Sequence, residues 1–217
     1  MDSIIFDLDG VLVFSDKYHY LAWKKMADEI GVYFDEEINN RLRGVSRMAS
    51  LDIILEKYSG KKLSADDKER LAERKNEYYR ELLAGMQPSD VTDNVRYTLD
   101  TLKSQGYKIA IGSSSKNTKY ILERVGLSDA FDAISDGTNI TNSKPDPEVF
   151  LKAADFLGSE YGNCLVVEDS DSGIDAAIAG GMKSAAIGEA TKSGKAIYNI
   201  NRLSDLIGIL GAERYSS

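Results

Sequence analysis

The chain has 217 residues, of which 42% are hydrophobic and 29% charged, a composition typical of a globular protein with one large domain or a core and a smaller insert. With 35 acidic and 27 basic residues the net charge is −8, the wrong sign for binding a phosphate backbone, so we expect no nucleic-acid partner. We also expect a cytoplasmic protein without membrane contact, because no apolar run approaches the roughly 20 residues of a membrane span and no basic leader precedes the first apolar run.

The first predicted element is the strand Ser3–Phe6, and the segment that follows it differs from the rest of the chain. From Ser15 to Met86 the apolar residues have helical spacing, and we find no convincing strand. Ser64 and Asp67 have the spacing of a capping box at the start of the last helix in this segment. We therefore predict an inserted helical-bundle cap domain over residues 15–86.

Beyond residue 86, short apolar runs alternate with helical patterns. The predicted strands are Lys108–Gly112, Phe131–Ile134, Cys164–Val167 and Ser184–Ile187. The predicted helices are Asn94–Gln105, Asn117–Val125, Pro147–Leu157 and Ser172–Ala179, followed by glycines Gly106, Gly126, Gly158 and Gly180 as C-terminal caps. This alternation predicts an α/β core, residues 1–14 and 87–217, with a doubly wound, Rossmann-like parallel sheet covered by helices on both faces.

Polar residues follow four of the five predicted strands. Asp7 and Asp9 come directly after the first strand; the other segments are 113-SSSKN-117, 143-SKPDP-147 and 168-EDSDSG-173. Each segment alone has an ordinary alternative, a polar loop or an aspartate that caps a helix. Because the carboxyl ends of parallel strands form the ligand crevice of such a sheet, their shared position favours a catalytic site.

The residue types in these segments indicate the chemistry. With one histidine and one cysteine, a metal site must consist chiefly of oxygen ligands, which favours Mg²⁺ and effectively excludes structural zinc. Glu168 and Asp169 suit a divalent cation shared with Asp7, while Lys144 and the hydroxyl groups suit a phosphoryl group. An aspartate carboxylate attacks phosphorus once positive charge neutralises the phosphoryl oxygens, so Asp7 is the predicted nucleophile and Asp9 the general acid/base.

The residues DLDGV at 7–11, Ser113, Lys144 and the pair Glu168–Asp169 resemble the four motifs of the haloacid dehalogenase superfamily of phosphotransferases. Further segments resemble the sugar-phosphate mutases of that superfamily, over roughly residues 1–190: His19 with Trp23, 42-LRGVSR-47 and 74-RKN-76. The resemblance implies a four-helix cap, a magnesium cofactor and sugar-phosphate substrates. It also implies isomerisation between β-D-glucose 1-phosphate and glucose 6-phosphate through an aspartyl-phosphate and β-glucose 1,6-bisphosphate.

The resemblance also implies a role for each matching residue. The expected Mg²⁺ ligands are Asp7, the backbone carbonyl of Asp9, Glu168 and Asp169. The expected contacts of the transferring phosphate are Ser113 and Lys144, and those of the rest of the substrate are Asp9, Gly44, Val45, Arg47, Lys75, Ser115, Lys116 and Asn117. His19 would couple cap closure to Asp9, or simply be a satisfied residue of the cap. Three positions depart from the pattern: Arg43 replaces a lysine, Ser15 replaces a threonine, and 92-TDN-94 lacks a Pro-Gly pair.

Two other functions stay open at this point. A phosphatase of the same superfamily would use water as the acceptor, and the core motifs do not separate the two activities. Arg47 favours the mutase, because a bisphosphate must be held at both ends, unless Arg47 is an ordinary surface cation. A binding protein without activity is the third reading, but it would be expected to lack Asp7, Asp9 or the metal ligands. We expect a monomer.

Overall fold

A computed structural model describes residues 1–42 and 46–215, and it divides the chain into two compact units. One unit consists of Met1–Phe14 and Gln87–Ser217, and the other of Ser15–Met86. We refer to them as the core unit and the helical unit, and each is described by itself. None of the helices in the described part of the chain combines the length and the hydropathy of a membrane-spanning segment.

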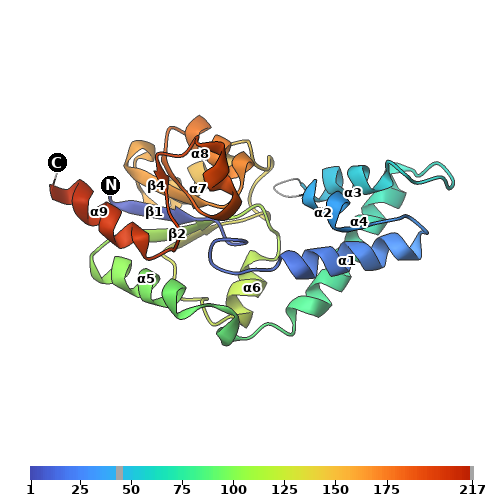
Figure 1. Ribbon diagram of the computed structural model, residues 1–217, viewed down its shortest axis with the longest axis horizontal. Helices are drawn as coiled ribbons and strands as arrows, with labels where there is room; N and C mark the ends of the chain where they lie inside the picture. The colour runs from blue at the N-terminus through green and yellow to red at the C-terminus, as the bar shows by residue number, and fades with distance from the viewer. Residues whose placement is uncertain (43–45, 216–217) are drawn as a thin grey trace. The chain divides into compact units, whose positions relative to one another are not determined.

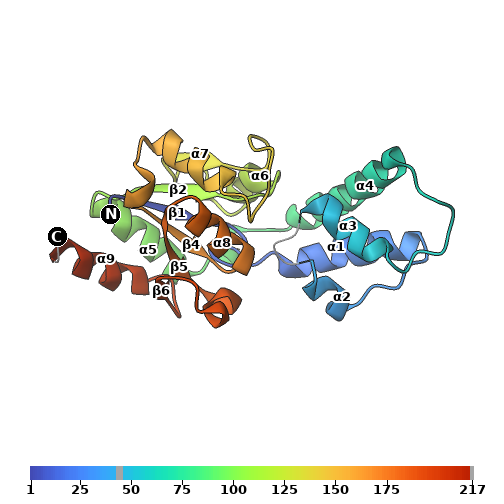
Figure 2. The same ribbon diagram turned by 90° about the horizontal axis from the view of Figure 1, so that it is seen from above.

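The core unit is built on a parallel sheet with the order β3-β2-β1-β4-β5-β6, of which Figure 2 labels β2, β1, β4, β5 and β6. All neighbouring strands in this order pair in parallel. The strands are β1 (Ser3–Phe6), β2 (Lys108–Gly112), β3 (Ala133–Ser135), β4 (Cys164–Glu168), β5 (Lys183–Ala186) and β6 (Tyr198–Asn199). The strand order reverses direction between β1 and β4, as in doubly wound α/β folds. The predicted fold class is therefore confirmed.

Helices cover both faces of this sheet, which is why β1 and β4 are buried at every residue. The helices are α5 (Asp93–Ser104), α6 (Thr118–Arg124), α7 (Glu148–Leu157), α8 (Asp171–Ala179) and α9 (Asp205–Tyr215). Figure 1 shows α7 and α8 on one face and α5 and α9 on the other. The core beneath α7 is formed by Val149, Phe150, Ala153 and Ala154, which pack on Ile5 and Val166 of the sheet.

Some boundaries differ from those predicted. Regular pairing of β3 begins at Ala133, two residues late, because the carboxylate of Asp132 accepts the Ile109 N–H in place of a backbone carbonyl. Helix α8 ends at Ala179 with Gly180 as its C-cap, as predicted, and the left-handed residue is the next one, Gly181, with φ +70°. The strand β6 and the helix α9 were not predicted. The left-handed caps at Gly106, Gly126 and Gly158 are confirmed.

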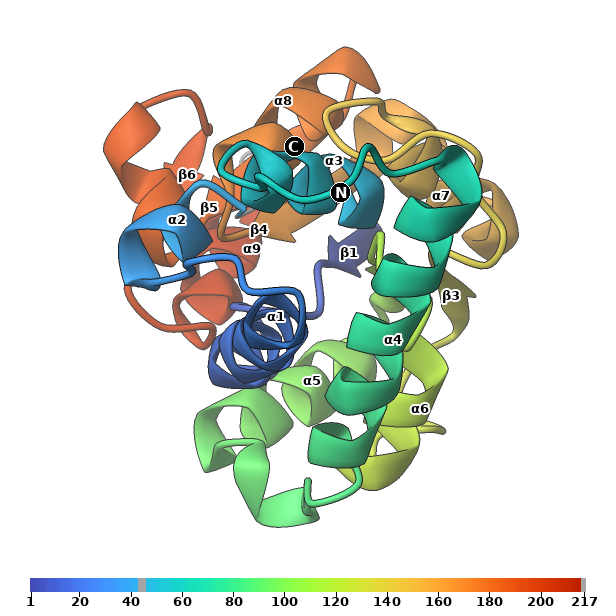
Figure 3. The ribbon, with the colours of Figure 1, turned by 90° about the vertical axis from the view of Figure 1, so that its right-hand side faces the viewer.

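The helical unit contains α1 (Asp16–Glu29), α2 (Glu36–Asn40), α3 (Arg47–Leu55) and α4 (Ala65–Leu83). The capping box at the start of α4 is confirmed, since Ser64 Oγ accepts the Asp67 N–H and the Asp67 carboxylate accepts the Ser64 N–H. Helices α1 and α4 pack against each other (Figure 3), and Trp23, Met26, Tyr79 and Leu83 are buried on them. The predicted site residues Gly44 and Val45, and the departure Arg43, lie outside the described residues.

Candidate active site

The pairing of β1 with β4 brings two carboxylates to the same level of the sheet. Phe6 is opposite Val167, and the Asp7 N–H donates to the Val167 carbonyl at 2.9 Å. Asp7 and Glu168 are therefore adjacent at the carboxyl ends of neighbouring strands, at the point where the strand order reverses. This is the position at which open parallel sheets bind their ligands.

Asp7, Glu168 and Asp169 form an acidic cluster in which one carboxylate oxygen of each residue lies within 4.8 Å of the others. Asp7 and Glu168 are buried, and Asp169 is partly exposed. Buried carboxylates of like charge repel one another unless a cation compensates them. Three carboxylates within this distance match the donor set that hard divalent cations such as Mg²⁺ prefer.

Lys144 joins this cluster from the loop that follows β3. Its Nζ donates to Asp7 Oδ1 at 2.6 Å and to Glu168 Oε1 at 2.5 Å, and its side chain is only 7% exposed. Burial alone would lower the pKa of Lys144, but the carboxylates of Asp7 and Glu168 outweigh it and hold that pKa above its usual value. The residue is therefore a fixed positive charge beside Asp7.

The electrostatic surroundings of Asp7 are dominated by its burial. Burial raises the pKa of Asp7 to about 7; Lys144 opposes this shift, and the Glu168 and Asp9 carboxylates add to it. A divalent cation in the cluster would favour the ionised form of Asp7 by the same Coulombic reasoning. Asp9 is partly exposed and follows in the turn where the Gly10 N–H donates to the Val13 carbonyl at 2.7 Å.

Two residues that were not predicted as part of the site hold Glu168 in place. The backbone N–H and the hydroxyl of Ser170 donate to Glu168 Oε2 at 2.7 and 2.8 Å. A Cβ at Gly173 would come within 1.9 Å of the Glu168 carboxyl, so α8 approaches this closely only with glycine there. Both residues lie in the segment 168-EDSDSG-173, but its letters alone do not show which of them supports Glu168.

The predicted phosphate-binding loop follows β2. Ser113 is buried, and its Oγ accepts the Ser115 N–H at 3.2 Å, while Ser115 Oγ accepts the Asn117 N–H at 3.2 Å. Asn117 is buried at the start of α6, and Lys116 is exposed. The Gly137 N–H donates to the Ser115 carbonyl at 3.2 Å, which ties this loop to the segment that carries Lys144. The loop is thus ordered from both sides.

In the helical unit the structure brings His19, Lys75 and Arg47 into one cluster. Lys75 Nζ lies 2.9 Å from His19 Nδ1 and 4.5 Å from the ring centre of Tyr79, on which the His19 ring stacks. Burial, followed by the charges of Lys75 and Arg47, holds the pKa of His19 well below its usual value. His19 is therefore neutral at physiological pH, and its Nδ1 accepts a hydrogen bond from the Lys75 ammonium.

Arg47 lies at the first position of α3, and its side chain is 28% exposed. One guanidinium nitrogen donates to Asn76 Oδ1 at 3.0 Å, and another lies 3.6 Å from the Glu73 carboxylate. Ser15, at the start of this unit, is buried and hydrogen-bonded to the Tyr79 hydroxyl at 2.9 Å. The predicted coupling of His19 to Asp9 joins residues of the two units and stays a prediction.

The sheet order and the carboxylate–lysine cluster define a doubly wound α/β protein with an acidic site at its switch point. A model of the haloacid dehalogenase-like hydrolases matches residues 1–181, and the chain belongs to that family. The expected resemblance is therefore confirmed. Membership fixes the fold and the superfamily, which includes enzymes with different phosphoryl acceptors.

Three relatives show the range of activities among similar proteins. The β-phosphoglucomutase of Bacillus subtilis is 38% identical over 208 residues, 95% of this chain and 92% of that protein. A phosphorylated carbohydrates phosphatase of Thermotoga maritima is 31% identical over 84% of this chain and 83% of that protein. The crystal structure of a β-phosphoglucomutase from Clostridium difficile is 38% identical, with a TM-score of 0.90 over 100% of this chain and 97% of that one.

Proposed function

We propose that the protein is a magnesium-dependent β-phosphoglucomutase, which interconverts β-D-glucose 1-phosphate and glucose 6-phosphate through β-glucose 1,6-bisphosphate. The observation that carries the proposal is the position of the Lys144 ammonium between Asp7 and Glu168. Similarity to two β-phosphoglucomutases at 38% identity over nearly the whole chain supports the choice of substrate.

In the proposed reaction, a carboxylate oxygen of Asp7 attacks the phosphorus of the bound sugar phosphate. A bond forms between this oxygen and phosphorus, and the bond from phosphorus to the sugar oxygen breaks. Asp9 donates a proton to the leaving oxygen. In the second step Asp9 removes a proton from the accepting sugar hydroxyl, whose oxygen bonds to phosphorus while the bond from phosphorus to Asp7 breaks and restores the carboxylate. Lys144 and Ser113 bind the phosphoryl oxygens, and Lys144 neutralises part of their charge.

We propose Mg²⁺ as the cofactor, with Asp7, the carbonyl of Asp9, Glu168 and Asp169 as its ligands. The three carboxylates within 4.8 Å support this assignment. When bound, the cation would supply positive charge that offsets the repulsion between these carboxylates and an anionic substrate. Lys144 alone does not compensate three carboxylates and a phosphate.

The cap residues decide between mutase and phosphatase. We propose that Arg47 binds the phosphate that is not transferred, that Lys75 contacts the sugar, and that Ser115, Lys116 and Asn117 contact the substrate from the core unit. Lys75 and Arg47, grouped around the neutral His19, support this, because they place two positive charges on a unit that carries no part of the acidic cluster. The second candidate, a sugar-phosphate phosphatase, is supported by the relative from Thermotoga maritima.

One assay separates these candidates. The protein is incubated with β-glucose 1-phosphate, Mg²⁺ and a trace of β-glucose 1,6-bisphosphate, and both glucose 6-phosphate and free phosphate are measured over time. A mutase forms glucose 6-phosphate much faster than it releases phosphate, because the sugar hydroxyl competes with water for the aspartyl-phosphate. Stoichiometric release of phosphate without glucose 6-phosphate would establish the phosphatase. Neither product, with the Asp7→Asn variant indistinguishable from the native protein, would refute both.

A further inference from the structure

Lys144 lies on a long loop without regular secondary structure, between the end of β3 at Ser135 and the start of α7 at Glu148. No ladder or helix fixes the backbone of such a loop, so beside a few backbone hydrogen bonds, such as that from the Asp146 N–H to the Ser143 carbonyl, its shape depends on side-chain contacts. Lys144 is nevertheless placed within hydrogen-bond distance of both Asp7 and Glu168. The contacts that fix this loop therefore bear directly on the site.

Three of these contacts come from Glu148, the first residue of α7. Its two carboxylate oxygens accept the Thr141 N–H, each at 3.0 Å, and Oε2 also accepts the Asn142 N–H at 2.7 Å. Hydrogen bonds to an ionised carboxylate are about twice as strong as those between neutral groups. The backbone two and three residues before Lys144 is thus tied to the helix that follows it.

Lys152, one turn further along α7, completes the arrangement. Its Nζ donates to Glu148 Oε1 at 2.7 Å and to the Asn139 carbonyl at 2.5 Å. Lys152 therefore orients the Glu148 carboxylate and also binds the loop itself. We call Glu148 and Lys152, with the loop backbone groups at 139, 141 and 142, the α7 clamp.

Glu148 keeps its negative charge over the pH range of an assay. Hydrogen bonds from Lys152, Asn142 and Thr141 hold the pKa of Glu148 at about 2. The carboxylate accordingly stays ionised wherever the protein is folded and active.

Helix α7 is a rigid base for such a clamp. Its inner face, including Val149 and Ala153, is fully buried against the sheet. Phe150 on the same face lies beneath Lys144, with Nζ 4.7 Å from the centre of its ring. One helix therefore contacts Lys144 from below and fixes the loop that precedes it.

We propose that Glu148 is a positioning residue for Lys144: through the α7 clamp it holds the Lys144 ammonium against Asp7 and Glu168. This inference rests on the proposed function only in assigning Lys144 to the phosphoryl group. The alternative is that Glu148 and Lys152 form an ordinary ion pair between residues four apart on a helix, with no effect on the loop.

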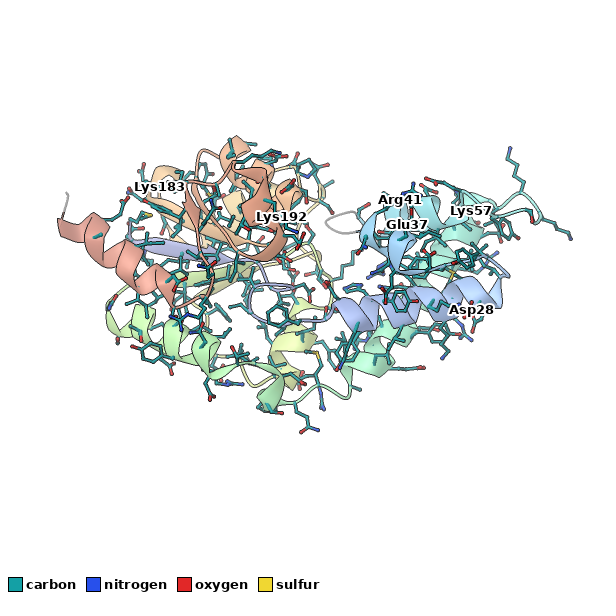
Figure 4. All side chains as sticks on the ribbon, in the orientation of Figure 1. Asp28, Glu37, Arg41, Lys57, Lys183 and Lys192 are labelled. Carbon is teal, nitrogen blue, oxygen red and sulfur yellow. The ribbon has the colours of Figure 1, made fainter. Side chains whose placement is uncertain are left out.

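The test compares Glu148→Gln with a matched control, Asp28→Asn. Asp28 accepts from Lys24 at 2.5 Å across the same four-residue spacing on α1, in the helical unit (Figure 4). Hydrogen exchange is measured at each amide, and acylation of Lys144 by an amine-reactive ester is followed by mass spectrometry, with exposed Lys119 as reference. In Glu148→Gln we expect exchange at Thr141 and Asn142 to rise about tenfold, the factor for one lost charge-assisted hydrogen bond, and Lys144 labelling to rise with it. Asp28→Asn should change neither.

The activity measurement is separate. With acetyl phosphate as donor, Glu148→Gln should phosphorylate Asp7 about tenfold more slowly than the native protein, in line with a displaced charge in the site. Unchanged exchange and labelling would overturn the inference, and so would loosening of the loop with an unchanged phosphorylation rate. If the native protein is never phosphorylated, the proposed function fails, while the exchange and labelling results still decide whether the clamp holds Lys144.

A second variant tests whether a general loss of stability could explain the result with Glu148→Gln. Lys152→Met keeps the Glu148 carboxylate and removes only the bonds to Asn139 and Glu148. We expect it to raise exchange at Thr141 and Asn142 and labelling of Lys144, by smaller factors than Glu148→Gln. If exchange at Thr141 and Asn142 rises in both variants only as much as the free energy of global unfolding falls, the inference is overturned.

Discussion

The Asp169 carboxylate occupies the space that a side chain at Gly10 would need. A Cβ built at Gly10 would lie 1.9 Å from Asp169 Oδ2, and Gly10 also has φ +82°, in the left-handed region that other residues rarely adopt. The turn after β1 and the turn after β4 are therefore in direct contact at the acidic cluster. The glycine of the DLDG motif allows a potential metal ligand to come this close to the backbone.

We predict that Gly10→Ala displaces Asp169 and impairs Mg²⁺ binding. The left-handed backbone alone should cost about 1–2 kcal/mol of stability, because Cβ approaches the following carbonyl. Gly106→Ala is the control, since Gly106 has φ +83° but nothing within 4 Å of its added Cβ. Both variants should melt at lower temperature. Only Gly10→Ala should lose the stabilisation by Mg²⁺, and equal Mg²⁺ responses in the two variants would contradict this explanation.

We predict different defects for the two aspartates that follow β1. Asp7→Asn should abolish phosphorylation by acetyl phosphate, because a neutral amide is a poor nucleophile toward phosphorus. Asp9→Asn should keep the fold and the metal site but lose proton transfer, which is typically worth ~10²–10⁴-fold in rate. Mass spectrometry of the phosphorylated protein and mutase turnover measure the two effects. Phosphorylated Asp7→Asn, or full turnover in Asp9→Asn, would refute the assigned roles.

Much of the core could be predicted because its signals are local. The strands β1, β2 and β4 are short apolar runs, and turn residues that need glycine or a capping side chain mark the helix ends. At 92-TDN-94, where a Pro-Gly pair is missing, Thr92 accepts the Val95 N–H at 3.3 Å and caps α5. The candidate ligands were found because Asp7 and Glu168 each follow an apolar strand.

The unpredicted parts depend on contacts between distant segments. Strand β6 has two residues and lies at the edge of the sheet, paired with β5, so its sequence carries no strand periodicity. The closeness of Gly173 to Glu168 and the bonds of Glu148 to the loop at 141–142 result from helix packing on the sheet. In the sequence, Glu148 is one of many charged residues in a first helical turn, and no spacing relates it to Lys144.

We predict that Mg²⁺ binding is linked to the protonation of Asp7. Burial raises the pKa of Asp7 to about 7 in the metal-free protein, and a Mg²⁺ ligand must be ionised. The apparent Mg²⁺ affinity should therefore fall by up to about tenfold per pH unit below pH 7. Because the folded pKa lies above the unfolded one, the contribution of Asp7 to the stability of the metal-free protein should be lost as pH rises toward 7.

Titration calorimetry at pH 6 and pH 8, in two buffers of different ionisation enthalpy, measures this linkage. The heat of Mg²⁺ binding should depend on the buffer at pH 6, where Asp7 releases a proton, and not at pH 8. Binding without proton release at pH 6 would show that Asp7 is already ionised in the metal-free protein.

The last prediction separates mutase from phosphatase and concerns Arg47. A planar guanidinium binds two oxygens of a phosphate, and Arg47 keeps 28% of its side chain exposed while Asn76 and Glu73 orient it. If Arg47 binds the phosphate that is not transferred, Arg47→Ala should lower kcat/KM for glucose 6-phosphate formation. The loss of transition-state stabilisation should be about 2–4 kcal/mol. Phosphorylation by acetyl phosphate, which has a single phosphoryl group, should hardly change.

Arg41→Ala is the matched control for this experiment. Arg41 belongs to the same unit and pairs with Glu56 at 2.6 Å, but its side chain is 49% exposed and its ion pair is at the surface (Figure 4). An exposed pair of this kind contributes little, so both activities should survive in Arg41→Ala. If Arg47→Ala also keeps full mutase turnover, Arg47 is an ordinary surface cation and does not bind the phosphate that is not transferred. Equal losses with both donors would instead indicate a defect in the helical unit as a whole, since acetyl phosphate offers no second phosphate for Arg47 to bind.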